Sequence, residues 1–293
     1  MTNDMVVDTT AKLTIRNLRV TLPGPSKKDP RKQILDGVDL TLRPGKISGI
    51  AGESGSGKTM TGLAVLGLLP PGAAVDGTIE FEGRNLLKLG SRELNGVRGR
   101  KIAMVFQDPS TSLHPMIKVG VQLTDHVRKH LGLSKRAAMA KAEGLLEMVA
   151  IPEPREALSK YPHQFSGGMR QRIAIAVALA CDPDVLIADE PTTALDVTVQ
   201  AGILRLLRRL CDDLGVAIML VTHDLGVMSA VADDVTVMRH GAIVEHGPRF
   251  DVLTNPQHPY TRELIASLPG NRIADPLEHG NADEIPDELE SAS

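Results

Sequence analysis

A short glycine-rich segment restricts the fold of this chain more than any other part of the sequence. An apolar run from Ile47 to Ala51 precedes the segment, and the apolar stretch from Met60 to Leu69 follows it. This order predicts a strand, a phosphate-binding loop and a helix. The eight residues between them fit the pattern G-x-x-x-x-G-K-[ST] without a gap: Gly52, Glu53, Ser54, Gly55, Ser56, Gly57, Lys58 and Thr59.

The residue types of this loop suit a triphosphate. Glycines let the backbone turn tightly and present its N–H groups to an anion, and the start of the following helix favours negative charge. We expect Lys58 to reach the β- and γ-phosphates and the Thr59 hydroxyl to bind Mg²⁺. The alternative is an ordinary glycine-rich turn. It is disfavoured because the glycine spacing, the Lys-Thr pair and the flanking elements all agree with the motif.

Length, charge and hydrophobicity restrict the number of domains and the class of function. The 293 residues allow one large domain or two smaller ones. A net charge of −3 gives no overall basic field for nucleic acid, although a local basic groove stays compatible with it. Residues 1–10 lack the basic start and apolar run of a secretory signal. The most apolar stretch, Ile173 to Cys181, is shorter than the roughly 20 residues of a membrane helix, so any membrane role is expected to need a partner.

The two cysteines, Cys181 and Cys211, stand without C-x-x-C spacing or histidines at metal-binding distance in the sequence. We therefore expect neither a disulfide nor a zinc site. Both are predicted to be core thiols in a reducing cytoplasm.

Periodicity divides the rest of the chain. Residues 1–11 are expected to be a flexible leader, and alternating apolar residues at 13–22 and 38–42 predict an antiparallel β-layer before the loop. A helical pattern fills 119–149, with Ser134 as the expected N-cap of its second part. Further on, apolar runs at 185–188 and 217–221 alternate with helical segments, which predicts a parallel sheet covered by helices.

The C-terminal part has its own signals. His240-Gly241 lies between two short apolar runs and predicts a hairpin. Short helical pieces are expected beyond Pro248. Residues 271–293 contain seven acidic residues and one basic residue, so this tail is expected to be largely disordered.

A second part of a nucleotide site is expected where an apolar strand, Val185 to Ala188, ends in two carboxylates. Asp189 would lie at the carboxyl end of this strand, where α/β sheets bind ligands, and would hold Mg²⁺ directly or through water. Glu190 would then orient or deprotonate the attacking water. A solvated acidic turn before Pro191 is the alternative, which the loop upstream disfavours.

A second glycine-rich segment, Ser166-Gly167-Gly168-Met169, opens an apolar helix. Its hydroxyl, bare N–H groups and helix dipole predict a second anion site. One nucleotide cannot easily use both glycine-rich sites of one chain. Two chains packed head to tail would allow it, with each Ser166 loop closing over the phosphate that the other chain's Lys58 holds.

The order and spacing of these motifs resemble the ATP-binding subunits of ABC transporters over roughly residues 12–250. The residues that carry the resemblance are the phosphate loop, Gln107, Ser166 to Gly168, Asp189-Glu190, Ala194-Leu195-Asp196 and His223. The resemblance implies an α/β fold with a P-loop NTPase core and parallel sheet, an antiparallel β subdomain and a helical subdomain at about 108–168. A short C-terminal extension (251–270) and the tail (271–293) would follow this nucleotide-binding domain.

The resemblance also implies roles for single residues. Gln107 would be the Q-loop residue that contacts Mg²⁺ and the water beside the membrane partner. His223 would be the switch histidine that contacts the γ-phosphate. Asp196 would be the D-loop aspartate at a dimer interface, and it would equally serve as an N-cap for the helix beginning at Val197. Met169 replaces the family's usual glutamine without altering the backbone of the anion site.

Three segments resemble the oligopeptide and dipeptide importer branch, with nickel importers as close competitors. They are Asn255 to Thr261 followed by Arg262-Glu263-Leu264, Gln107-Asp108-Pro109 with Thr111-Ser112-Leu113, and Tyr161 to Phe165. Many members of this branch carry an iron-sulfur cluster in the C-terminal extension. Because no cysteine follows Cys211, we predict no cluster here.

The resemblance implies an ATPase that requires Mg²⁺ and acts at the cytoplasmic face of the cell membrane. Its expected partners are a second nucleotide-binding subunit, favoured as a paralogue in a head-to-tail dimer, two transmembrane permeases and an extracytoplasmic substrate-binding protein, with no nucleic acid. A soluble ABC-type ATPase of translation or DNA repair is one alternative. The other is a cassette that binds ATP without hydrolysis, against which the intact Glu190 and His223 argue.

One departure from the family concerns the adenine base. The family commonly stacks the base on an aromatic residue near the end of the first β-layer, where this chain has Leu22. Stacking of a base on an aromatic side chain contributes about 1–3 kcal/mol in nucleic-acid complexes. We therefore expect Leu22→Tyr to lower the Kd for ATP, measured by isothermal titration calorimetry. A dissociation constant equal to that of the unchanged chain would contradict this assignment.

Overall fold

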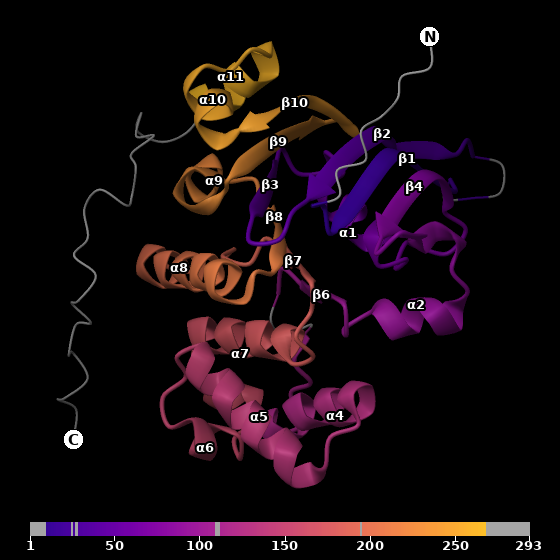
Figure 1. Cartoon of the computed structure of the whole chain (residues 1–293). Coiled ribbons are helices and arrows are strands. Elements are labelled where there is room, and N and C mark those ends of the chain that lie inside the picture. The colour runs from indigo at the N-terminus through magenta and orange to yellow at the C-terminus, as the bar shows by residue number, and fades with distance from the viewer. Residues whose placement is uncertain (1–9, 25, 27–28, 109–111, 194, 268–293) are drawn as a thin grey trace.

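Two β-sheets and a group of helices organise the chain (Figure 1). The computed structural model describes residues 10–24, 26, 29–108, 112–193 and 195–267. The strands are β1 (Leu13–Leu22), β2 (Lys32–Leu42), β3 (Ile47–Ala51), β4 (Ala74–Phe81), β5 (Arg84–Asn85), β6 (Ile102–Val105), β7 (Val185–Asp189), β8 (Ala217–Val221), β9 (Asp234–Arg239) and β10 (Ala242–Pro248). The helices are α1 (Lys58–Val65), α2 (Ser91–Val97), α4 (Val119–Leu131), α5 (Lys135–Met148), α6 (Pro154–Ala157), α7 (Gly167–Leu179), α8 (Val197–Leu214), α9 (Leu225–Val231), α10 (Arg249–Thr254) and α11 (Pro259–Ala266), with 3₁₀ turns η1 (Leu86–Lys88) and η2 (Pro162–Gln164).

The larger sheet has six strands in the order β10-β9-β3-β8-β7-β6. The strands from β9 to β6 run parallel, and β10 pairs antiparallel with β9 at one edge. Its central strands are apolar on both faces, since Leu186 and Ala188 of β7 join one hydrophobic core while Val185 and Ile187 join the other. Parallel sheets covered on both faces require such strands. The predicted α/β fold with a parallel sheet is confirmed.

The smaller sheet is antiparallel, with the strand order β2-β1-β4-β5. Its buried face joins Leu13 and Ile15 of β1 to Ala64 and Val65 of α1 and to Ile187 of β7. The helix that follows the phosphate loop is thereby packed between the two sheets. The antiparallel β-layer predicted before the loop is confirmed.

The helices α4 to α7 form a separate layer below the sheets in Figure 1. α4 and α5 pack against each other and against α7, which in turn contacts β6. The predicted N-cap of α5 is confirmed, because the Ser134 hydroxyl accepts a hydrogen bond from the Ala137 N–H. The helical pattern predicted at 119–149 corresponds to α4 and α5, whereas α7 corresponds to the helix predicted after that insert.

The helix after the phosphate loop is shorter than predicted. The apolar stretch from Met60 to Leu69 suggested a helix to that point, but α1 ends at Val65. Gly67 adopts a left-handed φ of 59°, which stops the helix. The side chain of Arg98, distant in the sequence, donates to the carbonyls of Leu66 and Gly67 and so satisfies the helix end.

The C-terminal elements close the edge of the larger sheet. β9 and β10 form the predicted hairpin, and His240 and Gly241 at its turn have φ values of 50° and 86°. α10 and α11 then pack on β10 (Figure 1). The greater part of the predicted leader (1–9) and the whole acidic tail (271–293) lie outside the described residues.

Both cysteines are buried, as the sequence predicts for core thiols. Among the described residues, no helix combines the length and the apolar character that crossing a membrane would require.

Helix α8 offers a matched test of the core. Leu207 is 0 % exposed, whereas Leu214 near the end of the same helix is 50 % exposed. We expect Leu207→Ala to lower the free energy of unfolding by about 2–5 kcal/mol, because it removes buried methyl groups and leaves a cavity. Leu214→Ala should change it by no more than about 0.5 kcal/mol. Denaturant unfolding measures both, and equal effects would contradict this packing.

Candidate functional site

The phosphate loop connects β3 to α1, as predicted. Gly57 is the N-cap of α1 with φ 108°, and Gly52 has φ 147°. A Cβ atom at Gly52 would lie 2.3 Å from the Met238 carbonyl oxygen, so only glycine fits this close approach. The loop therefore directs the N-terminus of α1 toward the space beyond the edge of the sheet.

Lys58 is the first residue of α1 and is only 5 % exposed. Its ammonium Nζ donates to the Gly52 carbonyl at 2.7 Å and to the Glu53 carbonyl at 2.9 Å. Burial lowers the pKa of Lys58, while the nearby carboxylates of Glu190, Asp189 and Glu53 act in the opposite direction. The loop thus carries a desolvated cation held by its own backbone, a suitable counter-charge for a phosphate.

Asp189 ends β7 and is buried. Its Oδ1 accepts a hydrogen bond from the Thr59 hydroxyl at 3.0 Å, which joins the second half of the site to the first. Burial raises the pKa of Asp189, and the Thr59 hydrogen bond opposes that rise. A carboxylate and a hydroxyl oxygen in contact at the phosphate loop fit Mg²⁺, which takes few protein ligands and completes its shell with phosphates and water. Within the described part of the chain, no cluster of three or more His, Cys, Asp or Glu side chains forms a further metal site.

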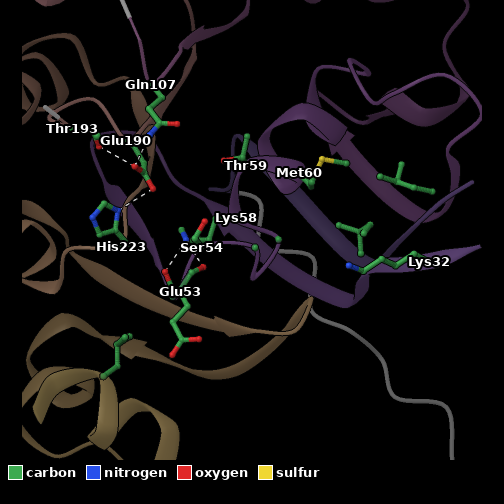
Figure 2. Close-up of a pocket in the computed structure, with 16 residues that line it drawn as sticks. Lys32, Glu53, Ser54, Lys58, Thr59, Met60, Gln107, Glu190, Thr193 and His223 are labelled. Carbon is green, nitrogen blue, oxygen red and sulfur yellow. Dashed lines mark hydrogen bonds and ion pairs between the residues drawn. The ribbon is translucent and has the colours of Figure 1, made fainter. Parts of the chain in front are cut away.

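Glu190 is the point where the other polar side chains meet (Figure 2). Its Oε2 accepts from Gln107 Nε2 at 3.0 Å and from the Thr193 hydroxyl at 2.9 Å. Its Oε1 lies 3.0 Å from His223 Nδ1. Glu190 has a left-handed φ of 45°, an uncommon conformation for this residue type, directly after the end of β7.

The environment of Glu190 favours its ionised form. Burial alone would raise the pKa of Glu190, but hydrogen bonds from His223 and Thr193 and the charge of Lys58 lower it on balance. The side chain of Glu190 is 16 % exposed and that of His223 is 58 % exposed. The carboxylate is therefore an ionised acceptor at the boundary between the core and solvent.

One open cleft of about 760 Å³ is lined by Lys58, Thr59, Gln107, Glu190, Thr193 and His223. The buried Asp189 is not part of the lining and lies behind it in contact with Thr59. Residues of the phosphate loop form its floor, with Glu190 and His223 on one side in Figure 2 and Lys32 and Met60 on the other. Leu22 and Ile34 add an aliphatic surface near Lys32. Leu22 thus lies in the cleft lining, as expected for a position beside the base.

The predicted second anion site lies elsewhere. Residues 166–169 are not among the described residues that line the cleft. The Ser166 hydroxyl accepts from the Met169 N–H and caps α7. A Cβ atom at Gly168 would lie 2.4 Å from Val199 Cγ1, so glycine lets α7 approach α8. Within one chain, the Ser-Gly-Gly helix start does not reach the phosphate loop.

Asp196 also lies outside the lining of this cleft. Its Oδ1 accepts from the Val199 N–H at 2.9 Å, which confirms its predicted role as the N-cap of α8. Ala194, which belongs to the same sequence motif, lies outside the described residues.

Sequence reasoning missed several residues of the cleft. Thr193 holds Glu190, yet a threonine in a turn carries no distinguishing sequence signal. Leu264 lines the cleft from α11, whereas its sequence motif indicates only a branch of the family. Lys32 and Ile34 come from β2, which forms a wall of the cleft only once the antiparallel sheet has folded over α1.

Known proteins resemble the chain in sequence. A family model described as ABC transporter matches residues 35–193, and one described as Oligopeptide/dipeptide transporter, C-terminal region matches residues 244–292. The Dipeptide transport ATP-binding protein DppD of Bacillus subtilis is 50% identical over 239 residues, which cover 81% of this chain and 71% of that protein. The Oligopeptide transport ATP-binding protein OppD of Salmonella typhimurium is 47% identical over 257 residues, which cover 88% of this chain and 76% of that protein.

Solved structures resemble its fold. The ATP-binding cassette MJ0796, in a dimeric post-hydrolysis state bound to ADP and Pi, matches with a TM-score of 0.71 and 27% identity. The match covers 81% of this chain and 98% of that one. Together with the geometry of the cleft, these similarities show that the chain belongs to the ABC transporter family of ATP-binding proteins, in the oligopeptide and dipeptide transporter branch.

Proposed function

We propose that this chain hydrolyses ATP and thereby energises a membrane-bound ABC importer of oligopeptides or dipeptides. The observation that carries the proposal is the ionised Glu190 carboxylate, held by Gln107, Thr193 and His223 beside the phosphate loop. The names of the relatives and the C-terminal family match support peptides as the cargo in preference to nickel.

The residues of the loop bind the triphosphate. Backbone N–H groups at the start of α1 and the Lys58 ammonium offset the charge of the β- and γ-phosphates. Lys58 would exchange its present contacts with the Gly52 and Glu53 carbonyls for phosphate oxygens. The Thr59 hydroxyl and the Asp189 carboxylate would hold Mg²⁺, with Gln107 as a further ligand, and the ion neutralises charge on the phosphates when bound.

Glu190 acts on the water. Its carboxylate orients a water molecule and accepts a proton from it as the water oxygen bonds to the γ-phosphorus. The bond from that phosphorus to the β,γ-bridging oxygen breaks, which yields ADP and inorganic phosphate. His223, more exposed than Glu190, is available to contact the γ-phosphate.

A second nucleotide-binding subunit completes the site in this proposal. Ser166 is exposed and opens the 13-residue helix α7, so its helix start is accessible to another molecule. A head-to-tail dimer would place this helix start against the phosphate held by the other subunit, and a paralogue is the favoured partner. The dimeric state named for the structural relative supports the formation of a dimer.

The remaining proposed partners are two transmembrane permeases and an extracytoplasmic substrate-binding protein. The subunit would act at the cytoplasmic face of the cell membrane. Closure of the dimer on two ATP molecules and its opening after cleavage would then move the permeases between their two states.

Glu190→Gln keeps the shape of the side chain but removes its basicity. We expect kcat for ATP hydrolysis in the full assembly to fall by roughly 10²–10⁴-fold, the usual contribution of a general base. ATP should still bind, so the variant should accumulate in the ATP-bound closed state. Glu156→Gln, an exposed ion-pair residue of the helical layer, is the control and should keep its rate. Near-normal phosphate release by Glu190→Gln would count against the mechanism.

Lys58→Ala removes the cation of the loop. Because hydrogen bonds to charged groups contribute about 1.5–3 kcal/mol, the Kd for ATP should rise by at least tenfold. Calorimetry with adenosine serves as a second arm, since binding of the base does not use this ammonium. Lys88→Ala, at an exposed lysine of η1, is the matched control. An unchanged Kd for ATP would contradict the role of Lys58.

A further inference from the structure

The C-terminal segment is joined to the phosphate loop by a hydrogen bond between residues far apart in the sequence. The Glu53 N–H donates to the hydroxyl oxygen of Tyr260 at 3.1 Å. Glu53 is the second residue of the loop, and its carbonyl accepts from the Lys58 ammonium. One residue of the loop is therefore held on one side by the extension and on the other by the phosphate-binding lysine.

Tyr260 is itself firmly placed. It is 2 % exposed, and the Arg239 guanidinium lies 4.5 Å from the centre of its ring. Arg239 ends β9, immediately before the hairpin turn at His240-Gly241. The Gly241 N–H donates to the Ser56 carbonyl at 2.9 Å, so the same region contacts the loop at a second point.

Contacts around Tyr260 explain the residue types of the segment 256–262 in which it lies. The Glu245 carboxylate of β10 accepts from the backbone N–H groups of Gln257 at 2.7 Å and His258 at 3.1 Å. His258 Nδ1 accepts from the Tyr260 N–H and caps α11, and Pro259 occupies the first position of that helix. The guanidinium of Arg262 donates to the carbonyls of Pro256 and Gln257. Residues 256–262 thus form a helix start that is capped by its own His258 and that places the Tyr260 hydroxyl at the phosphate loop.

The same helix also reaches the cleft. Leu264, one turn after Tyr260 on α11, is part of the cleft lining. The extension therefore touches the nucleotide site at the backbone of the loop and at the cleft wall.

We infer that Tyr260 is a positioning residue for the phosphate loop and that the C-terminal extension is a structural part of the nucleotide site. The inference rests on the proposed binding of ATP. The Tyr260 hydroxyl fixes the first turn of the loop before the nucleotide arrives. The folded chain has therefore already lost part of the conformational entropy that ordering the loop would otherwise cost on binding. By linkage, a bound nucleotide stabilises the docked position of α11.

Tyr260→Phe tests the inference with little change in packing. It keeps the ring beside Arg239 and removes the acceptor of the Glu53 N–H. We expect the Kd for ATP, and KM in the full assembly, to rise about three- to tenfold, the range for loss of one buried hydrogen bond, while kcat stays within about twofold. Tyr161→Phe changes the other tyrosine of the chain, which lies on the helical layer, and should leave both constants unchanged.

A second readout does not depend on activity. Hydrogen exchange of the Glu53 amide, measured without nucleotide, should be faster in Tyr260→Phe than in the unchanged chain and unaltered in Tyr161→Phe. If Tyr260 had only a general structural role, the variant would lower the stoichiometry of ATP binding through a smaller folded fraction and leave the Kd as it was.

The outcomes distinguish a failure of the inference on Tyr260 from a failure of the proposed function. Unchanged Kd together with unchanged Glu53 exchange in Tyr260→Phe would overturn the inference. Absence of ATP binding by the unchanged chain would instead overturn the proposed function, and the Glu53 exchange would still report whether Tyr260 holds the loop.

Discussion

The register of three neighbouring parallel strands is the constraint on which the nucleotide site depends. β3, β8 and β7 pair so that Ile50 and Asp189 both lie opposite Val221. The Glu190 N–H then donates to the Val221 carbonyl, which continues the alignment past the end of the strand. A slip of one residue would turn the side chains of a strand to the opposite face and separate the groups of the site. The loops that leave the sheet at this aligned edge carry Gly52, Glu190 and His223.

This alignment gives two adjacent carboxylates different environments. Asp189 is the last residue of a buried strand and contacts Thr59, and burial raises its pKa. Glu190 leaves the strand through a left-handed backbone turn and is surrounded by donors, which lower its pKa on balance. We propose two tasks for these neighbouring residues, ion binding for Asp189 and action on water for Glu190, and the Lys58 ammonium lies close enough to influence both carboxylates.

The sequence predicted those features whose cause is local. The loop, the caps at Ser134 and Asp196 and the hairpin at 240–241 depend on residues within a few positions of one another. The early end of α1 has a local signal in Gly67, which the apolar pattern of Met60 to Leu69 obscures, and only the Arg98 side chain that satisfies its last carbonyls comes from a distant segment. Tyr260 was missed because its partner is distant: it is 207 positions from Glu53, and its motif indicates a capped helix without revealing what the helix contacts.

In the proposed dimer, one chain carries only part of each ATP site, and Ser166 of a second subunit completes it. Both native thiols are buried, and burial raises the pKa of Cys211 to about 11, so a new surface cysteine is the accessible one. The direct measurement is the rate of maleimide labelling of Ser166→Cys in a Glu190→Gln background within the full assembly, with the exposed N-cap variant Ser134→Cys as the control. ATP should slow labelling at position 166 in the assembly and leave position 134 unaffected, and equal labelling of position 166 with and without ATP would contradict the account.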